Sequence, residues 1–340
     1  MSLVISYGQD LTSWCSFGIS CSAQAAITIT SVSELSQLLK ISEIAKLPKV
    51  ILGSGSNVLF TEAFDGLIIR NQIQGRVLHE DDNGHYVHLG GGEEWPSIVR
   101  WTLDQGIPGL ENLALIPGTA GAAPIQNIGA YGADFAEFCQ YVDWFDFESG
   151  QVERMTAQIC QFGYRDSIFK KQLRGRGMVV AVGLFLPKHW QPKISYGPLQ
   201  QLTAPDPEMI YKTVVYTRQS KLPDPTRLGN AGSFFKNPVI SFECFSELQA
   251  RYPSVPGYAD PAGMKLAAGW LIEQCQLKGK TIGGAQVHQQ QALVLVNLGN
   301  ATAQDVLKLA QYVVAQVHSK FGVLLEPEVR LLNSEGQSIW

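Results

Sequence analysis

A five-residue turn, Gly-Ser-Gly-Ser-Asn at positions 53–57, constrains the fold of this chain more than any other feature. It directly follows an apolar stretch, residues 49–52, that is typical of a β-strand. Successive backbone N–H groups in such a turn form a concave nest that can bind a pyrophosphate. The Rossmann fingerprint requires a third glycine and then a helix, whereas Val58 begins another apolar segment that we predict to be a strand. The usual dinucleotide fold is therefore not expected. The alternative to an anion-binding turn at 53–57 is a turn with a purely structural role.

A second segment, residues 116–132, contains no charged residue and is dense in Gly and Ala. Small residues in a long loop let the backbone approach a flat cofactor closely, and Asn127 and main-chain amides can bond to its ring heteroatoms. The alternative is a flexible linker. Linkers are rich in Ser and charge, however, and Ile116, Ile125, Ile128 and Tyr131 would be costly to leave in water. The segment therefore favours a cofactor-binding loop.

The bulk properties exclude several classes of protein. A length of 340 residues predicts two or three domains, and a net charge of −4 gives no electrostatic signature of nucleic-acid binding. From Met1 through Gly18 there is no targeting segment, and no stretch approaches the ~20 apolar residues of a membrane span, so we expect a cytoplasmic protein. The six cysteines contain no C-x-x-C pair and are expected to be reduced. His85 and His88 should point to opposite faces of a strand, so no metal site is predicted.

Hydrophobic periodicity predicts a mixture of helices and strands. A helix is expected to begin at a capping box formed by Ser31 and Glu34, others cover 93–105 and 208–220, and an apolar stripe marks a helix at 306–317. Met264, Ala267, Leu271 and Cys275 recur at helical spacing and predict one more helix. The predicted strands are 49–52, 58–60, 66–69, 85–89, 141–147, 178–186, 293–297, 323–325 and 329–332. The fold class is therefore α+β.

Two segments carry polar groups suited to binding. Arg165 stands beside Asp166 among bulky apolar residues, where its guanidinium can take a carboxylate, and a salt bridge to Asp166 is the alternative. Tyr196 lies in a Pro-rich connection, where it could close over a ligand or anchor the loop.

The stretch 229–237, Gly-Asn-Ala-Gly-Ser-Phe-Phe-Lys-Asn, places Ser233 after four small residues and before two aromatic ones. Neither a G-x-S-x-G motif nor a nearby base is evident, so a hydrolase triad is disfavoured. A role as proton donor suits this hydroxyl better, because a weakly acidic hydroxyl can protonate the very basic carbanion that the addition of a hydride produces. Lys221, Lys236 and Asn237 suit a diphosphate, and ordinary surface polarity is the alternative.

Near the C-terminus, residues 325–332 bring two carboxylates and an arginine into an apolar strand. Alternation places Glu328 and Arg330 on the same face. Exposure to solvent at the edge of a sheet would explain each charged residue separately. It explains less readily why these residues lie together within an apolar strand.

Taken together and in this order, the five segments 53–57, 116–132, 164–167, 229–237 and 326–330 resemble the UDP-N-acetylenolpyruvoylglucosamine reductase family, flavoenzymes of peptidoglycan precursor synthesis. The loop at Tyr196 resembles the type I branch, and the resemblance covers nearly the whole chain. It implies a two-subdomain FAD-binding module, PCMH/vanillyl-alcohol-oxidase-like, and a C-terminal α/β substrate-binding domain. The implied boundaries are 1–72 for the first subdomain, completed by strands in 322–340, then 73–220 for the second and 221–321 for the substrate-binding domain.

The resemblance also implies the reaction. NADPH would pass a hydride to N5 of non-covalent FAD, and N5 would deliver it to UDP-N-acetylglucosamine enolpyruvate. Ser233 would protonate the adjacent carbon to give UDP-N-acetylmuramate, while Arg165 and Glu328 would stabilise the enolate-like intermediate through the substrate carboxylate. We expect a monomer with no nucleic-acid or membrane partner.

The resemblance assigns two sets of binding residues. The implied FAD-binding residues are Gly53, Ser54, Gly55, Ser56, Asn57, Ile116, Pro117, Gly118, Gly121, Ala122, Asn127, Gly129 and Tyr131. The implied substrate-binding residues are Tyr164, Tyr196, Lys221, Asn237 and Gln291.

Two other functions remain open at this point. A flavin oxidase could use the same cofactor-binding architecture, but such enzymes often tether flavin through His or Cys, and the turn at 53–57 contains neither. A non-catalytic sensor of UDP-sugars would keep Tyr196 and Lys221, but it has no need for Ser233, Arg165 and Glu328 together.

Overall fold

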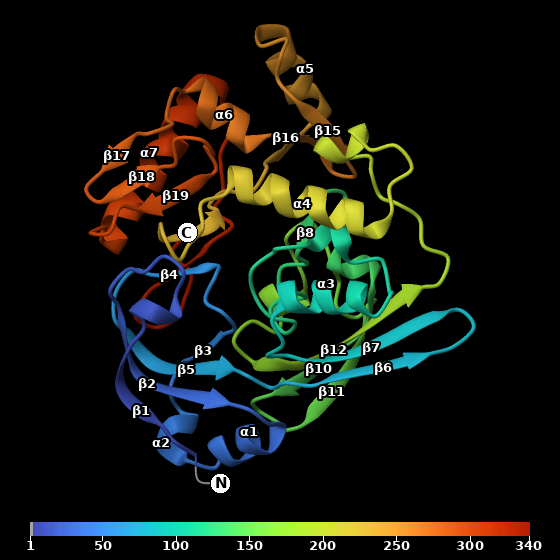
Figure 1. Cartoon of the computed structure of the whole chain (residues 1–340). Helices are drawn as coiled ribbons and strands as arrows, with labels where there is room; N and C mark the ends of the chain where they lie inside the picture. The colour runs from blue at the N-terminus through green and yellow to red at the C-terminus, as the bar shows by residue number, and fades with distance from the viewer. Residues whose placement is uncertain (1–2) are drawn as a thin grey trace. The chain divides into compact units, whose positions relative to one another are not determined.

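The computed structural model describes residues 3–340, so residues 1 and 2 of the first predicted domain lie outside it. Its backbone contacts divide into two compact units, each built from discontinuous segments (Figure 1). Unit 1 contains the described residues up to Gln9, then Ala23–Gly55 and Asp65–Ser220. Unit 2 contains Asp10–Ser22, Ser56–Phe64 and Lys221–Trp340.

The first sheet of unit 1 has four strands in the order β1-β2-β5-β3. Its strands are β1 (Ser6–Asp10), β2 (Ser22–Ile29), β3 (Lys49–Leu52) and β5 (Phe64–Asn71), and the short helices α1 (Val32–Leu38) and α2 (Ser42–Ala45) lie between β2 and β3. Helix α1 begins where predicted, because the Ser31 hydroxyl accepts a hydrogen bond from the backbone N–H of Glu34 at 3.4 Å. The Glu34 carboxylate accepts from the backbone N–H of Thr30, so the reciprocal half of the capping box is shifted by one residue.

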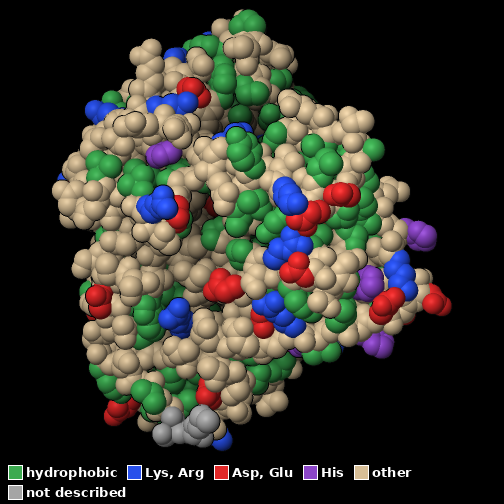
Figure 2. Space-filling view, viewed as in Figure 1, with side chains coloured by type: hydrophobic (Ala, Val, Ile, Leu, Met, Phe, Trp, Pro, Cys, Tyr) green, Lys and Arg blue, Asp and Glu red, His purple; other side chains and the backbone are tan. Residues whose placement is uncertain are grey.

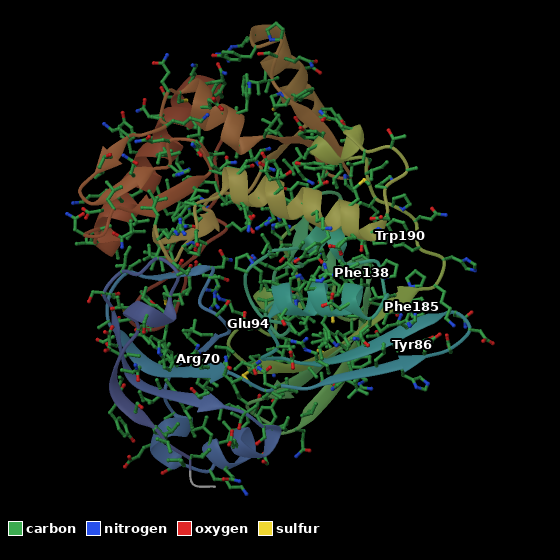
Figure 3. All side chains as sticks on the ribbon, viewed as in Figure 1. Arg70, Tyr86, Glu94, Phe138, Phe185 and Trp190 are labelled. Carbon is green, nitrogen blue, oxygen red and sulfur yellow. The ribbon has the colours of Figure 1, made fainter. Side chains whose placement is uncertain are left out.

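The second sheet of unit 1 has five strands in the order β11-β10-β12-β7-β6. Its strands are β6 (Arg76–Glu80), β7 (Gly84–Gly90), β10 (Cys139–Asp146), β11 (Val152–Thr156) and β12 (Gly177–Pro187). The central strand β12 is buried along almost its whole length, as its continuous apolar run predicts. Tyr86 on β7 and Phe185 on β12 pair across the strands with ring centroids 5.0 Å apart (Figure 3).

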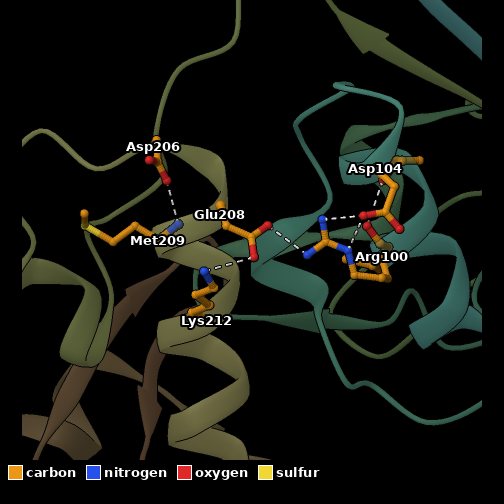
Figure 4. A network of polar contacts seen from close by, with 8 residues as sticks. Arg100, Asp104, Asp206, Glu208, Met209 and Lys212 are labelled. Carbon is orange, nitrogen blue, oxygen red and sulfur yellow. Dashed lines mark hydrogen bonds and ion pairs between the residues drawn. The ribbon is translucent and has the colours of Figure 1, made fainter.

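Helices α3 (Trp95–Asp104) and α4 (Pro207–Lys221) share a core with this sheet. The two helices are tied by Arg100 of α3, which donates to the Glu208 carboxylate at 2.8 Å and stacks over the Tyr211 ring at 4.9 Å (Figure 4). Glu208 also pairs with Lys212 on the next turn of α4. This tie fixes the first half of α4 relative to α3.

Unit 1 also contains short elements between its main strands. The strands β8 (Gly129–Ala130) and β9 (Ala133–Asp134) form a minimal hairpin. Unit 1 also contains the 3₁₀ turns η2 (Glu111–Leu113), η3 (Phe135–Glu137), η4 (Ile168–Lys170) and η5 (Gly197–Gln201). The 3₁₀ turn η1 (Thr12–Trp14) lies in unit 2.

Unit 2 packs its sheets and helices around a core of its own. One sheet has the order β13-β19-β18-β17, with β13 (Asn230–Ser233), β17 (Thr281–Ile282), β18 (Ala285–Val287) and β19 (Val294–Asn297). A second contains β14 (Val239–Ile240), β15 (Gly257–Asp260) and β16 (Gly263–Leu266), and β4 (Val58–Phe60) pairs in parallel with β20 (Arg330–Leu332). Helices α5 (Phe242–Arg251), α6 (Ala268–Gln274) and α7 (Ala303–Phe321) complete the unit. The predicted stripe of α7 is buried at Val306, Leu309, Ala310, Val313 and Val317.

Two predicted elements are wrong. Met264 lies in strand β16, and the helix whose stripe it was assigned to begins only after Ala267. Residues 323–325 form no strand, although Val323 and Leu325 are buried. In both places the apolar residues are correctly predicted as core, but burial alone does not determine the backbone conformation.

Charged side chains of both signs are interspersed on the face shown in Figure 2, without a large patch of one sign. None of the helices in the described part of the chain combines the length and apolar character that a membrane crossing requires. Within residues 3–340, no group of three or more His, Cys, Asp or Glu side chains is arranged to hold a metal ion.

The cysteines differ strongly in exposure. Burial raises the pKa of Cys15, Cys139 and Cys160 to about 12 and that of Cys21 to about 11, so these thiols stay protonated at neutral pH. Cys244 is exposed.

We expect one fast-reacting thiol, Cys244, when the native protein is titrated with an aromatic disulfide reagent near neutral pH, and all six after unfolding in guanidinium. Loss of the fast phase in Cys244→Ser checks the assignment, and a fast phase that persists would contradict it.

Candidate active site

The turn at 53–57 connects β3 directly to β4, as predicted. Within residues 3–340, the backbone N–H groups of Ser54, Gly55 and Ser56 donate to no other backbone group. The Ser54 hydroxyl is buried without a hydrogen-bond partner. A Cβ added at Gly53 would lie 2.5 Å from Thr119 Oγ1, so this glycine is needed for the close approach of the two segments. The turn thus offers a cluster of unused donors, which suits an anion.

The glycine-rich segment 116–132 is held against residues 91–95 of unit 1. The backbone N–H of Trp95 donates to Gly118 O at 2.9 Å, and the N–H of Gly121 donates to Gly91 O at 2.8 Å. Glu94, labelled in Figure 3, forms a backbone bridge with Thr119. Burial raises the pKa of the Glu94 carboxyl, and the charge of Arg70 opposes that rise. The segment is therefore an ordered loop and not a linker.

Asn127 holds this loop in shape. Its φ is +45°, its Nδ2 donates to Gly163 O at 3.1 Å, and its Oδ1 accepts from the N–H of Ala136 at 2.8 Å. The side-chain amide thus bonds to the backbone of the protein itself. The backbone around Asn127 is then left as the surface that a cofactor could meet.

The β8–β9 hairpin turns at Tyr131 and Gly132, which both have positive φ values, +50° and +84°. Such a two-residue turn normally has Asn-Gly or Gly-Gly, so a tyrosine there is an unusual choice. Its ring stacks edge-on against the Tyr196 ring, with centroids 6.3 Å apart. The structure thus brings together two predicted site residues that lie 65 positions apart in the chain.

Arg165 occupies another strained turn, with φ +55°, between the bridged residues Gly163 and Asp166. Its Nη2 donates to Gly129 O in β8 at 2.8 Å, and its guanidinium lies over the Tyr164 ring at 5.3 Å from the centroid. Asp166 forms an ion pair with Lys171. Backbone strain of this kind concentrates at functional sites.

The prediction missed one residue of this cluster, Arg218 on α4. Burial lowers the pKa of its guanidinium, and smaller electrostatic contributions come from Tyr131, which raises this pKa, and from Arg165, which lowers it, so the three side chains of unit 1 interact. A charged residue one turn after the buried Val214 was a signal in the sequence, because it falls on the apolar face of the helix.

In unit 2, Ser233 ends strand β13 after Gly232, whose φ is +68°. The two residues that follow, Phe234 and Phe235, are fully buried and pack edge-on at 5.0 Å. Within the described chain the Ser233 hydroxyl makes no hydrogen bond. The strand therefore presents this hydroxyl on a backbone anchored by two buried rings.

Glu328 pairs through its backbone with Phe234, the residue that follows Ser233. The backbone N–H of Glu328 donates to Phe234 O at 2.7 Å, and the N–H of Lys236 donates to Glu326 O at 2.9 Å. Asn57 Nδ2 donates to Glu328 O at 3.3 Å. Glu326 is exposed and pairs with Lys236 at 3.2 Å. The extension of β13 thus brings residues 233, 328 and 57 together, and Glu326 is engaged elsewhere.

Two more predicted residues of unit 2, Asn237 and Gln291, lie near the start of α6. Asn237 Oδ1 accepts from the backbone N–H of Ala268 at 3.0 Å, and Gln291 Oε1 accepts from the N–H of Leu293 at 3.4 Å. A Cβ added at Gly269 would lie 3.6 Å from Gln291 Oε1. Lys221 ends α4 and is exposed.

The N-terminal segment 11–22, to which the sequence assigns no motif, supports the Ser233 strand. Ser16 Oγ donates to Asn230 O at 2.6 Å, and the N–H of Asn230 donates back to Ser16 O at 3.0 Å. The Phe17 ring packs edge-on against Phe234 at 6.4 Å. A Cβ added at Gly229 would lie 2.2 Å from Phe17 O. The segment is therefore a buttress behind β13.

Two family models match this chain. One is described as the C-terminal domain of UDP-N-acetylenolpyruvoylglucosamine reductase and matches residues 224–332, and the other is an FAD binding domain that matches residues 23–156.

Curated proteins named UDP-N-acetylenolpyruvoylglucosamine reductase are similar to the chain over nearly their whole length. That of Photobacterium profundum is 51% identical, covering 97% of this chain and 96% of the relative. That of Escherichia coli (strain K12) is 49% identical, covering 96% and 97%. A crystal structure of the reductase from Thermus caldophilus, 24% identical, matches the fold with a TM-score of 0.66 over 97% of this chain and 99% of that chain. These findings confirm the predicted fold class, an FAD-binding module followed by a C-terminal domain.

Proposed function

Because this chain belongs to the UDP-N-acetylenolpyruvoylglucosamine reductase family, an oxidoreductase family of peptidoglycan precursor synthesis, we propose that it reduces UDP-N-acetylglucosamine enolpyruvate to UDP-N-acetylmuramate with NADPH as hydride donor. The observation that carries this proposal is the pairing of residues 326–328 with 234–236, which places the backbone of Glu328 opposite Phe234, the residue that follows Ser233. A sensor of UDP-sugars has no use for a hydroxyl and a carboxylate placed in this way.

FAD is the cofactor, and the residues of the chain fit it. The nest at 53–57 offers unused backbone donors and the orphaned Ser54 hydroxyl, which suit the pyrophosphate. The ordered loop 116–132 offers a backbone lined by small residues, which suits a flat ring system. The proposed FAD-binding residues remain Gly53, Ser54, Gly55, Ser56, Asn57, Ile116, Pro117, Gly118, Gly121, Ala122, Asn127, Gly129 and Tyr131. The chemistry that bound FAD supplies is hydride transfer from NADPH to the terminal enol-ether carbon of the substrate.

The protein groups then have distinct roles in this proposal. The Ser233 hydroxyl gives its proton to the carbon next to the one that receives hydride. Arg165 holds the substrate carboxylate, where negative charge develops, and Glu328 assists it as a carboxylic acid that donates a hydrogen bond, because an ionised carboxylate there would repel the charge. Such preorganised donors typically contribute about 3–4 kcal/mol each to transition-state stabilisation. The UDP-sugar is bound by the remaining proposed residues, Tyr164, Tyr196, Lys221, Asn237 and Gln291.

The test is oxidation of NADPH by the purified protein with and without UDP-N-acetylglucosamine enolpyruvate, followed by mass spectrometry of the product. We expect oxidation that depends on the sugar and a product heavier by two hydrogens. A yellow protein that releases its flavin on acid precipitation is expected as well. A colourless protein would favour the sensor, flavin retained in the precipitate would favour a covalent oxidase, and oxidation independent of the sugar would contradict the proposal.

The domain division 1–72 with 322–340, 73–220 and 221–321 is part of the same proposal. The parallel pairing of β20 with β4 joins the C-terminal strand to residues 58–60 of the proposed first subdomain, although both strands belong to the compact unit that also contains residues 221–321. A cytoplasmic, monomeric enzyme is also proposed, and light scattering of the purified protein tests the monomer.

The contact between Gly53 and Thr119 gives a local test of the FAD nest. In Gly53→Ala the new Cβ would lie 2.5 Å from Thr119 Oγ1, and overpacking of this kind costs about 1–3 kcal/mol. We expect this variant to retain less flavin per chain, measured as the ratio of flavin to protein absorbance. Thr119→Ala alone should bind flavin normally, and Gly53→Ala/Thr119→Ala should recover part of the loss, because only Thr119 Cβ, at 3.3 Å, then remains close. Normal flavin content in Gly53→Ala would contradict the expectation.

A further inference from the structure

Arg218 stands on the apolar face of α4, four residues after the buried Val214. Its Nε is shielded from solvent and has no hydrogen-bond partner. Within residues 3–340, no carboxylate forms an ion pair with its guanidinium. Guanidinium N–H groups that are shielded from solvent normally have a partner, so the Nε of this half-buried arginine is unusual.

The groups that face Arg218 come from several elements of unit 1. Burial lowers the pKa of the Arg218 guanidinium, the charge of Arg165, in the turn after Gly163, lowers it further, and Tyr131, in the β8–β9 turn, acts in the opposite direction. Tyr196 packs on Tyr131, and Asp134 of β9 interacts with Arg165. Two cations thus share this cluster with two phenols, and Asp134 acts on Arg165.

Helix α4 is a rigid support for this side chain. Arg100 ties its first half to α3 through Glu208 and Tyr211 (Figure 4). Leaving a guanidinium without a counterion is unfavourable in the ligand-free protein and becomes favourable when an oxyanion enters. A second guanidinium nearby strengthens the preference for a doubly or multiply charged ligand.

We propose that Arg218 is a binding residue for an oxyanion of the UDP-sugar substrate, either the enolpyruvyl carboxylate or a phosphate of the diphosphate. This inference rests on the proposed function, and it adds a second arginine to the predicted Arg165. Both candidate groups present oxygen pairs that match the planar fork of a guanidinium.

The test compares Arg218→Met, Arg218→Lys and the control Arg174→Met, which removes an exposed arginine of the same unit. Dissociation constants are measured on the oxidised holoenzyme by titration calorimetry with UDP-N-acetylglucosamine enolpyruvate and with UDP. We expect Arg218→Met to weaken binding of the enolpyruvyl sugar at least tenfold, Arg218→Lys to lie between, and Arg174→Met to match the wild type. Weaker binding of UDP as well identifies a phosphate as the ligand, whereas unchanged UDP binding identifies the carboxylate.

Thermal unfolding separates binding from a structural role. Removal of a buried charge that faces Arg165 should leave the Tm of ligand-free Arg218→Met equal to or above that of the wild type, while the upward Tm shift caused by the enolpyruvyl sugar is lost. Wild-type affinity for the enolpyruvyl sugar in Arg218→Met would overturn the proposal, as would a lower Tm with the ligand-induced shift intact. Should Arg218→Met fail to fold, wild-type affinity in Arg218→Lys would overturn it. The proposed function fails separately, if the wild-type enzyme does not turn over the enolpyruvyl sugar.

Discussion

Ser233→Ala is expected to slow reduction of the enolpyruvyl sugar by about 10²–10⁴-fold, the usual contribution of a general acid, while reduction of the flavin by NADPH stays nearly intact. The reason is that the hydroxyl is needed only when the carbanion is protonated. The structure supports this role by the anchored end of β13, where the Ser233 hydroxyl makes no hydrogen bond within the described chain and Glu328 is adjacent.

Rapid-mixing absorbance measures the two half-reactions separately, because the flavin loses its colour in the first and regains it in the second. Ser246→Ala, which removes an exposed serine hydroxyl of α5, is the matched control and should behave like the wild type. An equal loss in both half-reactions would refute the assigned role, since it would indicate damage to the flavin site or to the fold.

Gly229→Ala is expected to lower the stability of unit 2 and to disturb β13. A Cβ at this position would lie 2.2 Å from Phe17 O and 2.9 Å from Phe17 C, which are backbone atoms that cannot move without displacing the whole buttress. Overpacking of this kind costs about 1–3 kcal/mol, so the Tm should fall by several degrees. The second half-reaction should slow as well, because β13 carries Ser233.

Differential scanning calorimetry and the same rapid-mixing experiment measure these effects. Gly269→Ala is the control for stability, since its Cβ would make only ordinary contacts, at 3.4 Å and beyond, at the start of a helix. Gly229→Ala with an unchanged Tm would show that the chain at Phe17 adapts, and the buttress would then have little influence on β13.

The sequence predicted those parts of the fold whose signals are local. The strand–turn–strand at 49–60, the cap at Ser31 and the stripe of α7 depend on neighbouring residues, and each was correct. Helix α6 was misplaced because its start is set from far away: the side chain of Asn237 accepts from the backbone N–H of Ala268. No pattern around Met264 could reveal a cap that comes from another part of the chain.

The candidate site likewise contains residues that local motifs suggest and residues whose placement depends on distant parts of the chain. Motifs made Ser233, Glu328 and Arg165 candidates, because their segments are distinctive in composition, and their roles stay predictions. Arg218 was missed because a lone arginine in an amphipathic helix resembles a solvated one until its neighbours are known. The supporting role of residues 11–22 was also invisible, since Ser16 and Asn230 meet across 214 positions of the chain.

The buttress has a consequence for biosynthesis. Residues 10–22 and 56–64 leave the ribosome long before residues 221–340, yet all of them belong to one compact unit. The early segments therefore cannot complete their packing until the last stretch of polypeptide emerges, and until then they stay exposed or bound to chaperones. A fragment that begins at Lys221 would keep β19, the strand partner of β13, but it would lack the buttress that packs on β13 and the strand β4 that pairs with β20, so we do not expect it to fold as it does in the whole chain.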